Sequence, residues 1–296
     1  MYQKQNHAGN TPDFWEENWE AGHFEESLKF CSVDPLRPLF EKYTKEGSLM
    51  LEGGCGIGQY LAYYASKKRR VIGLDFAQQA LQNLHKRQNY LNLCGGDVSN
   101  LPFADETFDL YYSGGVVEHF EGGAESSLEE AQRVLKKDGV LLISVPYFSP
   151  LRQILAPFRK DEWRKVVKPE IDGKEFSASR KFFQYVYQPK EFEKMLANAK
   201  LRVIEKQGYA VLWGLYVIPF FNLEGKSEFS NNLEATVKKE VTAVDNIKEL
   251  IKDTPSSLVK KLVVSEDDTI PLLGLGVKMM RWATANMMMY VCKKDL

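Results

Sequence analysis

The sequence predicts an α/β protein whose mostly parallel sheet is doubly wound. Three observations support this fold class: short apolar runs alternate with segments of helical periodicity, the first run leads into a glycine-rich turn, and a carboxylate closes the second run. Strand, helix and strand at this spacing form right-handed βαβ units, in which consecutive strands lie parallel.

The first half of the chain supplies most of this pattern. Apolar runs of strand length bounded by turn residues predict strands, and they occupy residues 48–52, 70–75, 91–94, 108–113 and 140–145. Apolar residues three and four positions apart predict helices, and these occupy residues 59–66, 77–90 and 128–135.

The pattern pauses after Pro146, where residues 147–188 are rich in aromatic and basic side chains and lack a clear period. It returns with a helix at 189–199, opened by a proline that suits the first helical turn, and a strand at 201–210. Residues 224–270 are charge-rich and indicate a surface insertion. A helix at 273–285 and a last strand at 287–292 complete the expected fold.

Composition restricts the class of protein. The 296 residues carry a net charge of −1 with an isoelectric point near 6.5, unlike the basic footprint of a dedicated nucleic-acid binder. The four cysteines show no C-x-x-C spacing, so neither a zinc site nor a disulfide framework is expected. No signal-peptide layout is visible at the start, and the longest apolar run, 211–223, is too short to span a bilayer, so we expect a cytoplasmic protein.

The strongest motif is the turn LMLEGGCGIGQY at residues 49–60. Glycines suit a tight turn at which the backbone approaches a ligand closely, and the helix that follows presents free N–H groups. A dinucleotide fingerprint would place its third glycine where Gln59 stands. The observed pattern is G-x-G-x-G preceded by an acid.

This turn resembles the first motif of class I S-adenosylmethionine-dependent methyltransferases, of the methyltransferase type 11 kind. The resemblance implies a Rossmann-like fold with a seven-stranded sheet whose last strand is antiparallel, and S-adenosylmethionine as the cofactor, without a metal. It implies that Glu52 holds the amino-acid end of the cofactor, and that the turn lines it through Gly54, Cys55, Gly56 and Gly58.

Two later segments resemble the same family. Asp75 closes the second strand 23 positions after Glu52, where the family places the acid that grips the ribose, with Phe76 beside the adenine. The alternative for Asp75 is a helix cap. In the run at 95–120 the resemblance assigns Asp97 and Val98 to the adenine, and it places Ser113 and Gly114 beneath the sulfonium and methionine part.

The sequence also departs from related motifs. Glu52 replaces the commoner aspartate, and the segment from Ser113 to Gly115 lacks the Asn/Asp-Pro-Pro-aromatic signature of enzymes that methylate amino groups of bases or glutamine. These differences favour a small-molecule acceptor, such as an anionic, sugar or lipid-like metabolite methylated on oxygen or nitrogen. They argue against a nucleic-acid partner. The sequence leaves the oligomeric state open.

His119 is the candidate general base, because its ordinary pKa lies near neutral pH and it follows the fourth strand. The alternative is that Glu118 and His119 form a structural pair. Acceptor contacts are expected from Trp15 and Trp19 in the N-terminal segment and from Tyr147 and Phe148 after the fifth strand. The alternative is packing, which is the commoner role of aromatics such as those in the N-terminal segment.

The expected organisation is an N-terminal helical lid at residues 1–44 and a methyltransferase domain at 45–296, with insertions near 147–188 and 211–285 that form a cap on the acceptor side. The basic cluster at 152–168 indicates a solvated helix face or contact with an anionic acceptor. Three other functions stay open: a nicotinamide-dependent oxidoreductase, a non-catalytic scaffold that binds S-adenosylmethionine, and a methyltransferase with a protein or RNA acceptor.

Overall fold

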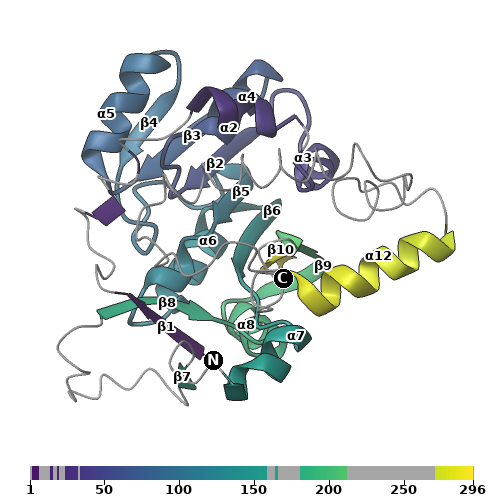
Figure 1. Ribbon diagram of the computed structural model, residues 1–296. Helices are drawn as coiled ribbons and strands as arrows, with labels where there is room; N and C mark the ends of the chain where they lie inside the picture. Colours follow the sequence, from purple (N-terminus) through teal and green to yellow (C-terminus); the bar gives the residue numbers. More distant parts are fainter. Residues whose placement is uncertain are drawn as a thin grey trace.

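The computed structural model describes residues 2–6, 14–15, 19, 24–32, 34–158, 164–165, 181–211 and 271–295. A seven-stranded sheet in the order β4-β3-β2-β5-β6-β10-β9 forms its centre (Figure 1). The strands are β2 (Leu49–Gly53), β3 (Arg70–Asp75), β4 (Asn92–Gly95), β5 (Phe108–Gly114), β6 (Leu135–Pro146), β9 (Leu201–Tyr209) and β10 (Met287–Lys294).

The direction of the strands confirms the expected α/β fold. β2 pairs in parallel with β3 and β5, β3 with β4, and β5 with β6. The last strand, β10, lies between β6 and β9 and is antiparallel to both. Because β10 is covered on both faces, its sequence from Met287 to Cys292 is almost continuously apolar.

Helices cover both faces of the sheet, because successive strand residues point to opposite sides. On one face Leu51, Tyr111 and Ile143 pack with residues of α6 (Glu125–Val134) and α8 (Pro189–Asn198). On the other, Met50 and Leu110 belong to a second apolar cluster. The helices that contribute to it are α2 (Phe24–Phe30), α3 (Arg37–Tyr43), α4 (Gln59–Ser66) and α5 (Gln78–Arg87).

One boundary differs from the prediction. Leu135, expected at the end of a helix, is the first residue of β6 and pairs with Phe108. The next pair along the ladder joins Leu110 to Val140, so residues 136–139 form a long bulge within β6. The Lys136 ammonium group contacts the Asp109 carboxylate at 2.7 Å and fixes this bulge.

A second, three-stranded antiparallel sheet has the order β7-β1-β8. Its strands are β7 (Arg164–Lys165), β1 (Tyr2–Asn6) and β8 (Lys181–Val186). Residues 2–6, which the sequence placed in a helical segment, are therefore a strand. They pair with β7 and with β8, which lies 175 to 184 positions later in the chain, so local periodicity gave no signal for them.

The small sheet is joined to the carboxyl end of β6, because Tyr187, directly after β8, pairs with Tyr147. The same region contains η1 (Val117–His119), α7 (Pro150–Leu155) and η2 (Ala156–Phe158). α12 (Pro271–Thr284) contacts α7 and leads into β10 (Figure 1). Among the described residues, no helix is both long and apolar enough to cross a membrane.

Candidate cofactor and acceptor site

The glycine-rich turn joins β2 to α4 at the carboxyl edge of the sheet. Gly54, Gly56 and Gly58 have φ values of 73°, 50° and 72°, which side chains other than glycine rarely adopt. The N–H groups of Gly54 and Cys55 both donate to the carbonyl oxygen of Leu74, at 2.7 and 3.1 Å. The turn is therefore fixed to the neighbouring strand β3.

Cys55 belongs to this turn only through its backbone. Its side chain is buried, and its sulfur lies 2.9 Å from the position of a Cβ built on Gly73. Burial, with Glu52 and Asp75 nearby, raises the pKa of the thiol well above its usual value. Any contact of Cys55 with a ligand at the turn is therefore expected from its peptide group.

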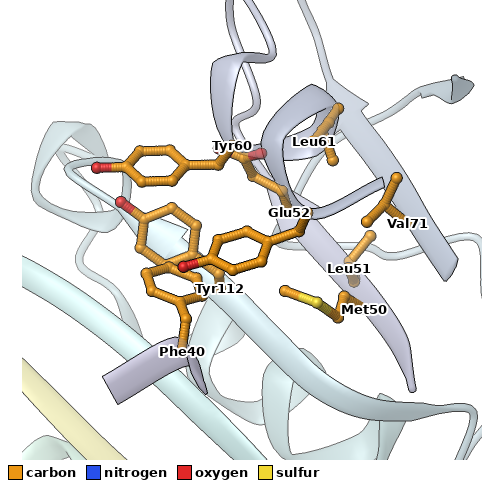
Figure 2. Close-up of a pocket in the computed structure, with 9 residues that line it drawn as sticks. Phe40, Met50, Leu51, Glu52, Tyr60, Leu61, Val71 and Tyr112 are labelled. Atoms are coloured by element: carbon orange, nitrogen blue, oxygen red, sulfur yellow. The ribbon is translucent and has the colours of Figure 1, made fainter. Parts of the chain in front are cut away.

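Glu52 lies near the end of β2 with 7% of its surface exposed, and burial together with the nearby Asp75 raises its pKa well above the usual range. It is part of the wall of a small pocket (Figure 2). The lining residues are Phe40, Met50, Leu51, Glu52, Tyr60, Leu61, Tyr64, Val71 and Tyr112.

Within the described part of the chain, the Oε2 atom of Glu52 has no hydrogen-bond partner. A buried acceptor oxygen in this state is costly unless a ligand or water supplies a donor. An ammonium group would both donate to the oxygen and favour its charged form. The amino-acid end of S-adenosylmethionine carries such a group, so the residues present fit this cofactor.

Asp75 at the end of β3 connects the turn to α5. Its Oδ2 accepts the Gly56 N–H at 2.8 Å, and its Oδ1 accepts the Ala77 N–H at 2.9 Å at the start of the helix. Burial raises the pKa of this carboxyl, and the backbone donors oppose the shift. Asp75 thus accepts the N–H of Ala77, the N-cap residue, and does not itself cap α5. Each carboxylate oxygen keeps a further lone pair for a ligand hydroxyl. Phe76 beside it is 46% exposed.

The ends of β4 and β5 complete this edge. After β4, Asp97 accepts the Ser99 N–H at 2.8 Å, and Val98 is buried against Gly53, with its Cγ1 atom 2.9 Å from a Cβ built there. At the end of β5, Ser113 is buried, and the following Gly115 donates its N–H to Ser144 of β6 at 3.1 Å. The structure therefore brings together at one edge the three segments that the sequence singled out.

His119 lies in η1 under an aromatic cluster. Its Nδ1 is 2.8 Å from the carbonyl oxygen of Phe183, so Nδ1 carries the proton of the neutral ring. Its ring meets those of Trp15 and Phe183 edge-on, at centroid distances of 4.8 and 5.0 Å. Burial lowers the pKa of His119 to about 4, which keeps the ring neutral but makes it a weak base at neutral pH.

The aromatic cluster extends from His119 to the glycine turn. Trp15 stacks on Trp19 at 5.8 Å, and the Trp19 ring lies 2.9 Å from a Cβ built on Gly56. The two tryptophans thus connect His119 with the glycine turn, and their place on the acceptor side stays a prediction. Sequence reasoning did not single out Phe183, since it lies in a segment without a clear period.

The side chains that follow β6 are packed in the protein interior. Tyr147 and Phe148 are both buried, and the Tyr147 hydroxyl donates to the carbonyl oxygen of Trp282 at 2.9 Å. Arg152, placed by its sequence in a basic cluster with a solvated face, is buried as well. Its guanidinium donates to the carbonyl oxygens of Tyr147 and Asn286 and to the Asn286 side chain.

Comparison with known proteins agrees with this geometry. Residues 51–143 match a family model described as "Methyltransferase domain". A probable S-adenosylmethionine-dependent methyltransferase of Mycolicibacterium smegmatis is 35% identical over 120 residues, which are 39% of this chain and 46% of that protein. A human protein described as probable tRNA methyltransferase 9B is 29% identical over 148 residues, 48% of this chain and 31% of that protein. The chain thus spans half or less of the length of these two relatives.

A solved structure shares the fold over nearly the whole chain. It is a putative methyltransferase in complex with the Haloferax volcanii Trm112 methyltransferase activator; the TM-score is 0.54, the identity 16%, and the match covers 95% of this chain and 98% of that one. Residues 51–143 form a methyltransferase domain of the class I S-adenosylmethionine-dependent kind. The resemblance stated from the motifs is confirmed, and a nicotinamide-dependent oxidoreductase is set aside.

Proposed function

We propose that this protein transfers the methyl group of S-adenosylmethionine to a small-molecule acceptor. The observation that carries the proposal is the cradle at the ends of β2 and β3, where the left-handed glycine turn meets two buried carboxyl groups, Glu52 and Asp75. The cofactor would supply an electrophilic methyl group on its sulfonium. The protein then has to align the acceptor with that group and exclude water.

Each residue of the cradle has a proposed part in holding the cofactor. Glu52 would pair with its ammonium group, Asp75 with the ribose hydroxyls, and Phe76 would contact the adenine. The remaining contacts are proposed for Gly54, Cys55, Gly56, Gly58, Asp97, Val98, Ser113 and Gly114. The burial of Glu52 and Asp75 beside the turn, and the exposure of Phe76, support these assignments.

We also propose that residues 1–44 act as a lid and that the insertions near 147–188 and 211–285 form a cap on the acceptor side. The contacts of Trp19 with Gly56 and of Trp15 with His119 support a lid that reaches from the cofactor turn to the acceptor. The second insertion falls mainly outside the described residues. The lowered pKa of His119 favours a role in positioning over proton removal.

Binding of S-adenosylhomocysteine, measured by isothermal titration calorimetry, tests the proposal. We expect the wild type to bind and Asp75→Asn to bind at least about tenfold more weakly, because the amide has one acceptor oxygen in place of two. Glu121→Gln, at an exposed position, is the matched control. Equal affinity of the wild type and Asp75→Asn would contradict the role of Asp75, and no binding at all would contradict the function.

A second candidate function is methylation of RNA. The likeness to a protein described as a probable tRNA methyltransferase favours it, whereas the net charge of −1 does not. Incubation with S-adenosylmethionine labelled in its methyl group and with either total tRNA or a metabolite extract separates the two. Label in the tRNA would support RNA methylation and contradict the small-molecule proposal. Label in neither fraction would support a non-catalytic scaffold.

A further inference from the structure

A buried acid lies near the carboxyl ends of β5 and β6, next to the cofactor cradle. Glu118 of η1 is 2% exposed, and its Oε1 atom is 3.5 Å from the position of a Cβ built on Gly115, just after β5. Oε2 has no hydrogen-bond partner among the described residues. Burial raises the pKa of this carboxyl to about 8, and hydrogen bonding to its own backbone N–H only partly opposes the shift.

A second buried polar group without a hydrogen-bond partner lies within range of the Glu118 charge. Tyr187, which follows β8, is 1% exposed, and within the described residues its hydroxyl also lacks a hydrogen-bond partner. Burial raises the pKa of this phenol, and the Glu118 carboxylate adds to the shift, as expected for a neighbouring negative charge. The backbone around Tyr187 is fixed, since its N–H donates to the Pro146 carbonyl oxygen and its own carbonyl oxygen accepts the Phe148 N–H.

Packing alone does not account for this pair. Burial of a hydroxyl or carboxyl without a hydrogen-bond partner is costly, so folded proteins contain few such groups. Glu118 is near enough to Tyr187 to raise its pKa, and both residues belong to the end of the sheet where α/β proteins bind their ligands. A ligand group that carries several hydrogens would supply donors to both oxygens.

The surroundings favour a cation as that ligand group. His119, next to Glu118 in η1, is held neutral, and the rings of Trp15 and Phe183 lie against it. A carboxylate in a dry site needs an opposite charge, and the neutral His119 does not supply one. A carboxylate or phosphate acceptor would not stabilise the charged form of Glu118.

We infer that Glu118 and Tyr187 bind the ammonium group of an amine acceptor, and that the Glu118 carboxylate takes one proton from it. This inference rests on the proposed methyl transfer and names its substrate class. Loss of the proton leaves a neutral amine and a protonated Glu118. The nitrogen lone pair then forms a bond to the methyl carbon as the S–CH3 bond breaks, and the sulfur keeps that electron pair in S-adenosylhomocysteine.

Binding of n-propylamine to the complex with S-adenosylhomocysteine tests this inference without knowledge of the natural acceptor. Calorimetric titrations at pH 8 compare the wild type with Glu118→Gln, Tyr187→Phe and Glu121→Gln. We expect at least about tenfold weaker binding for Glu118→Gln, because a hydrogen bond between charged groups is replaced by a neutral one. A smaller loss is expected for Tyr187→Phe and none for Glu121→Gln, whose side chain is exposed.

The outcomes separate the two proposals. Failure to bind S-adenosylhomocysteine defeats the proposed function and this inference with it. Binding of S-adenosylhomocysteine without binding of propylamine, or with equal propylamine affinity in Glu118→Gln, overturns the inference alone. Near-ultraviolet circular dichroism checks that the variants fold. If Glu118→Gln does not fold, equal binding by Tyr187→Phe and the wild type overturns the inference.

Discussion

At the scale of single residues, η1 contains two neighbouring groups whose pKa values are displaced in opposite directions. Burial raises the pKa of Glu118 to about 8 and lowers that of His119 to about 4. In both cases the neutral form is favoured, since the low dielectric disfavours charge. The order of proton affinities is therefore the reverse of that in water, and Glu118 is the stronger base of the pair.

Glu118→Gln should flatten the pH dependence of stability. The folded state holds a proton on Glu118 more tightly than the unfolded chain does, because the ordinary pKa of a glutamate side chain is near 4.5. The stabilisation is therefore complete below pH 4.5 and is lost as the pH rises through about 8, a change of up to roughly 5 kcal/mol. Urea unfolding of the wild type and of Glu118→Gln from pH 5 to 9 measures this change. If the free energy of unfolding of the two proteins had the same pH dependence, the pKa of Glu118 would not be raised by folding.

His119 should stay neutral across the physiological range. Its folded pKa is lowered, so its contribution to stability is complete above pH 6.5 and is lost as the pH falls towards 4. Nitrogen-15 NMR of the imidazole should show a proton on Nδ1 that persists from pH 5.5 to 8, as the contact with the Phe183 carbonyl oxygen requires. A titration midpoint near 6.5 would restore His119 as a candidate general base.

At the scale of elements, the turn between β2 and α4 depends on glycine for both its dihedral angles and its close contacts. Gly56 has a positive φ, and a Cβ there would meet the Trp19 ring at 2.9 Å. Gly122, in the loop before α6, has no atom within 4 Å of its Cβ position. A side chain at Gly56 would therefore be strained, whereas one at Gly122 would meet no other atom. Gly122 is thus a matched control for Gly56.

Gly56→Ala should weaken S-adenosylhomocysteine binding at least about tenfold and destabilise the fold by about 1–2 kcal/mol, since a left-handed alanine is strained. Gly122→Ala should change neither quantity. Calorimetry and thermal unfolding measure both effects. A Gly56→Ala protein with wild-type affinity would mean that the conformation of the turn does not determine binding.

Arg133 of α6 fixes the loop that follows β4. Its guanidinium donates to the carboxylates of Glu130 and Asp105 and to the carbonyl oxygens of Leu101 and Phe103. We expect Arg133→Ala to lower the free energy of unfolding by about 1–3 kcal/mol, less than its five hydrogen bonds imply, because the side chain is partly exposed. Arg133→Lys should recover only part of the loss, because lysine lacks the planar fork. Full recovery would show that charge alone suffices.

At the scale of the whole molecule, the site is formed where strands from distant parts of the sequence end together. A ligand bound there should stabilise the entire fold by about 2.7 kcal/mol at one hundred times its Kd, which shifts the Tm by a few degrees. We expect this shift with S-adenosylhomocysteine and none with NADH. A larger shift with NADH would point to the other cofactor class.

The sequence by itself determined the central sheet and the cofactor cradle. The strands and the helix from Leu49 to Asp75 occur within a residue or two of their expected positions. They depend on local periodicity and on the conformation that the glycines of the turn adopt, and both can be predicted from neighbouring residues. The antiparallel last strand was also anticipated, through the family resemblance, and its apolar run marked a strand covered on both faces.

Only the tertiary structure decided what distant segments do to one another. It made residues 2–6 a strand through pairing with β8, extended β6 back to Leu135 through pairing with β5, and buried Tyr147 and Arg152. It also buried both Glu118 and Tyr187. Pairing, burial and the resulting pKa shifts depend on which parts of the chain exclude water from a group, and that information is spread over the whole sequence.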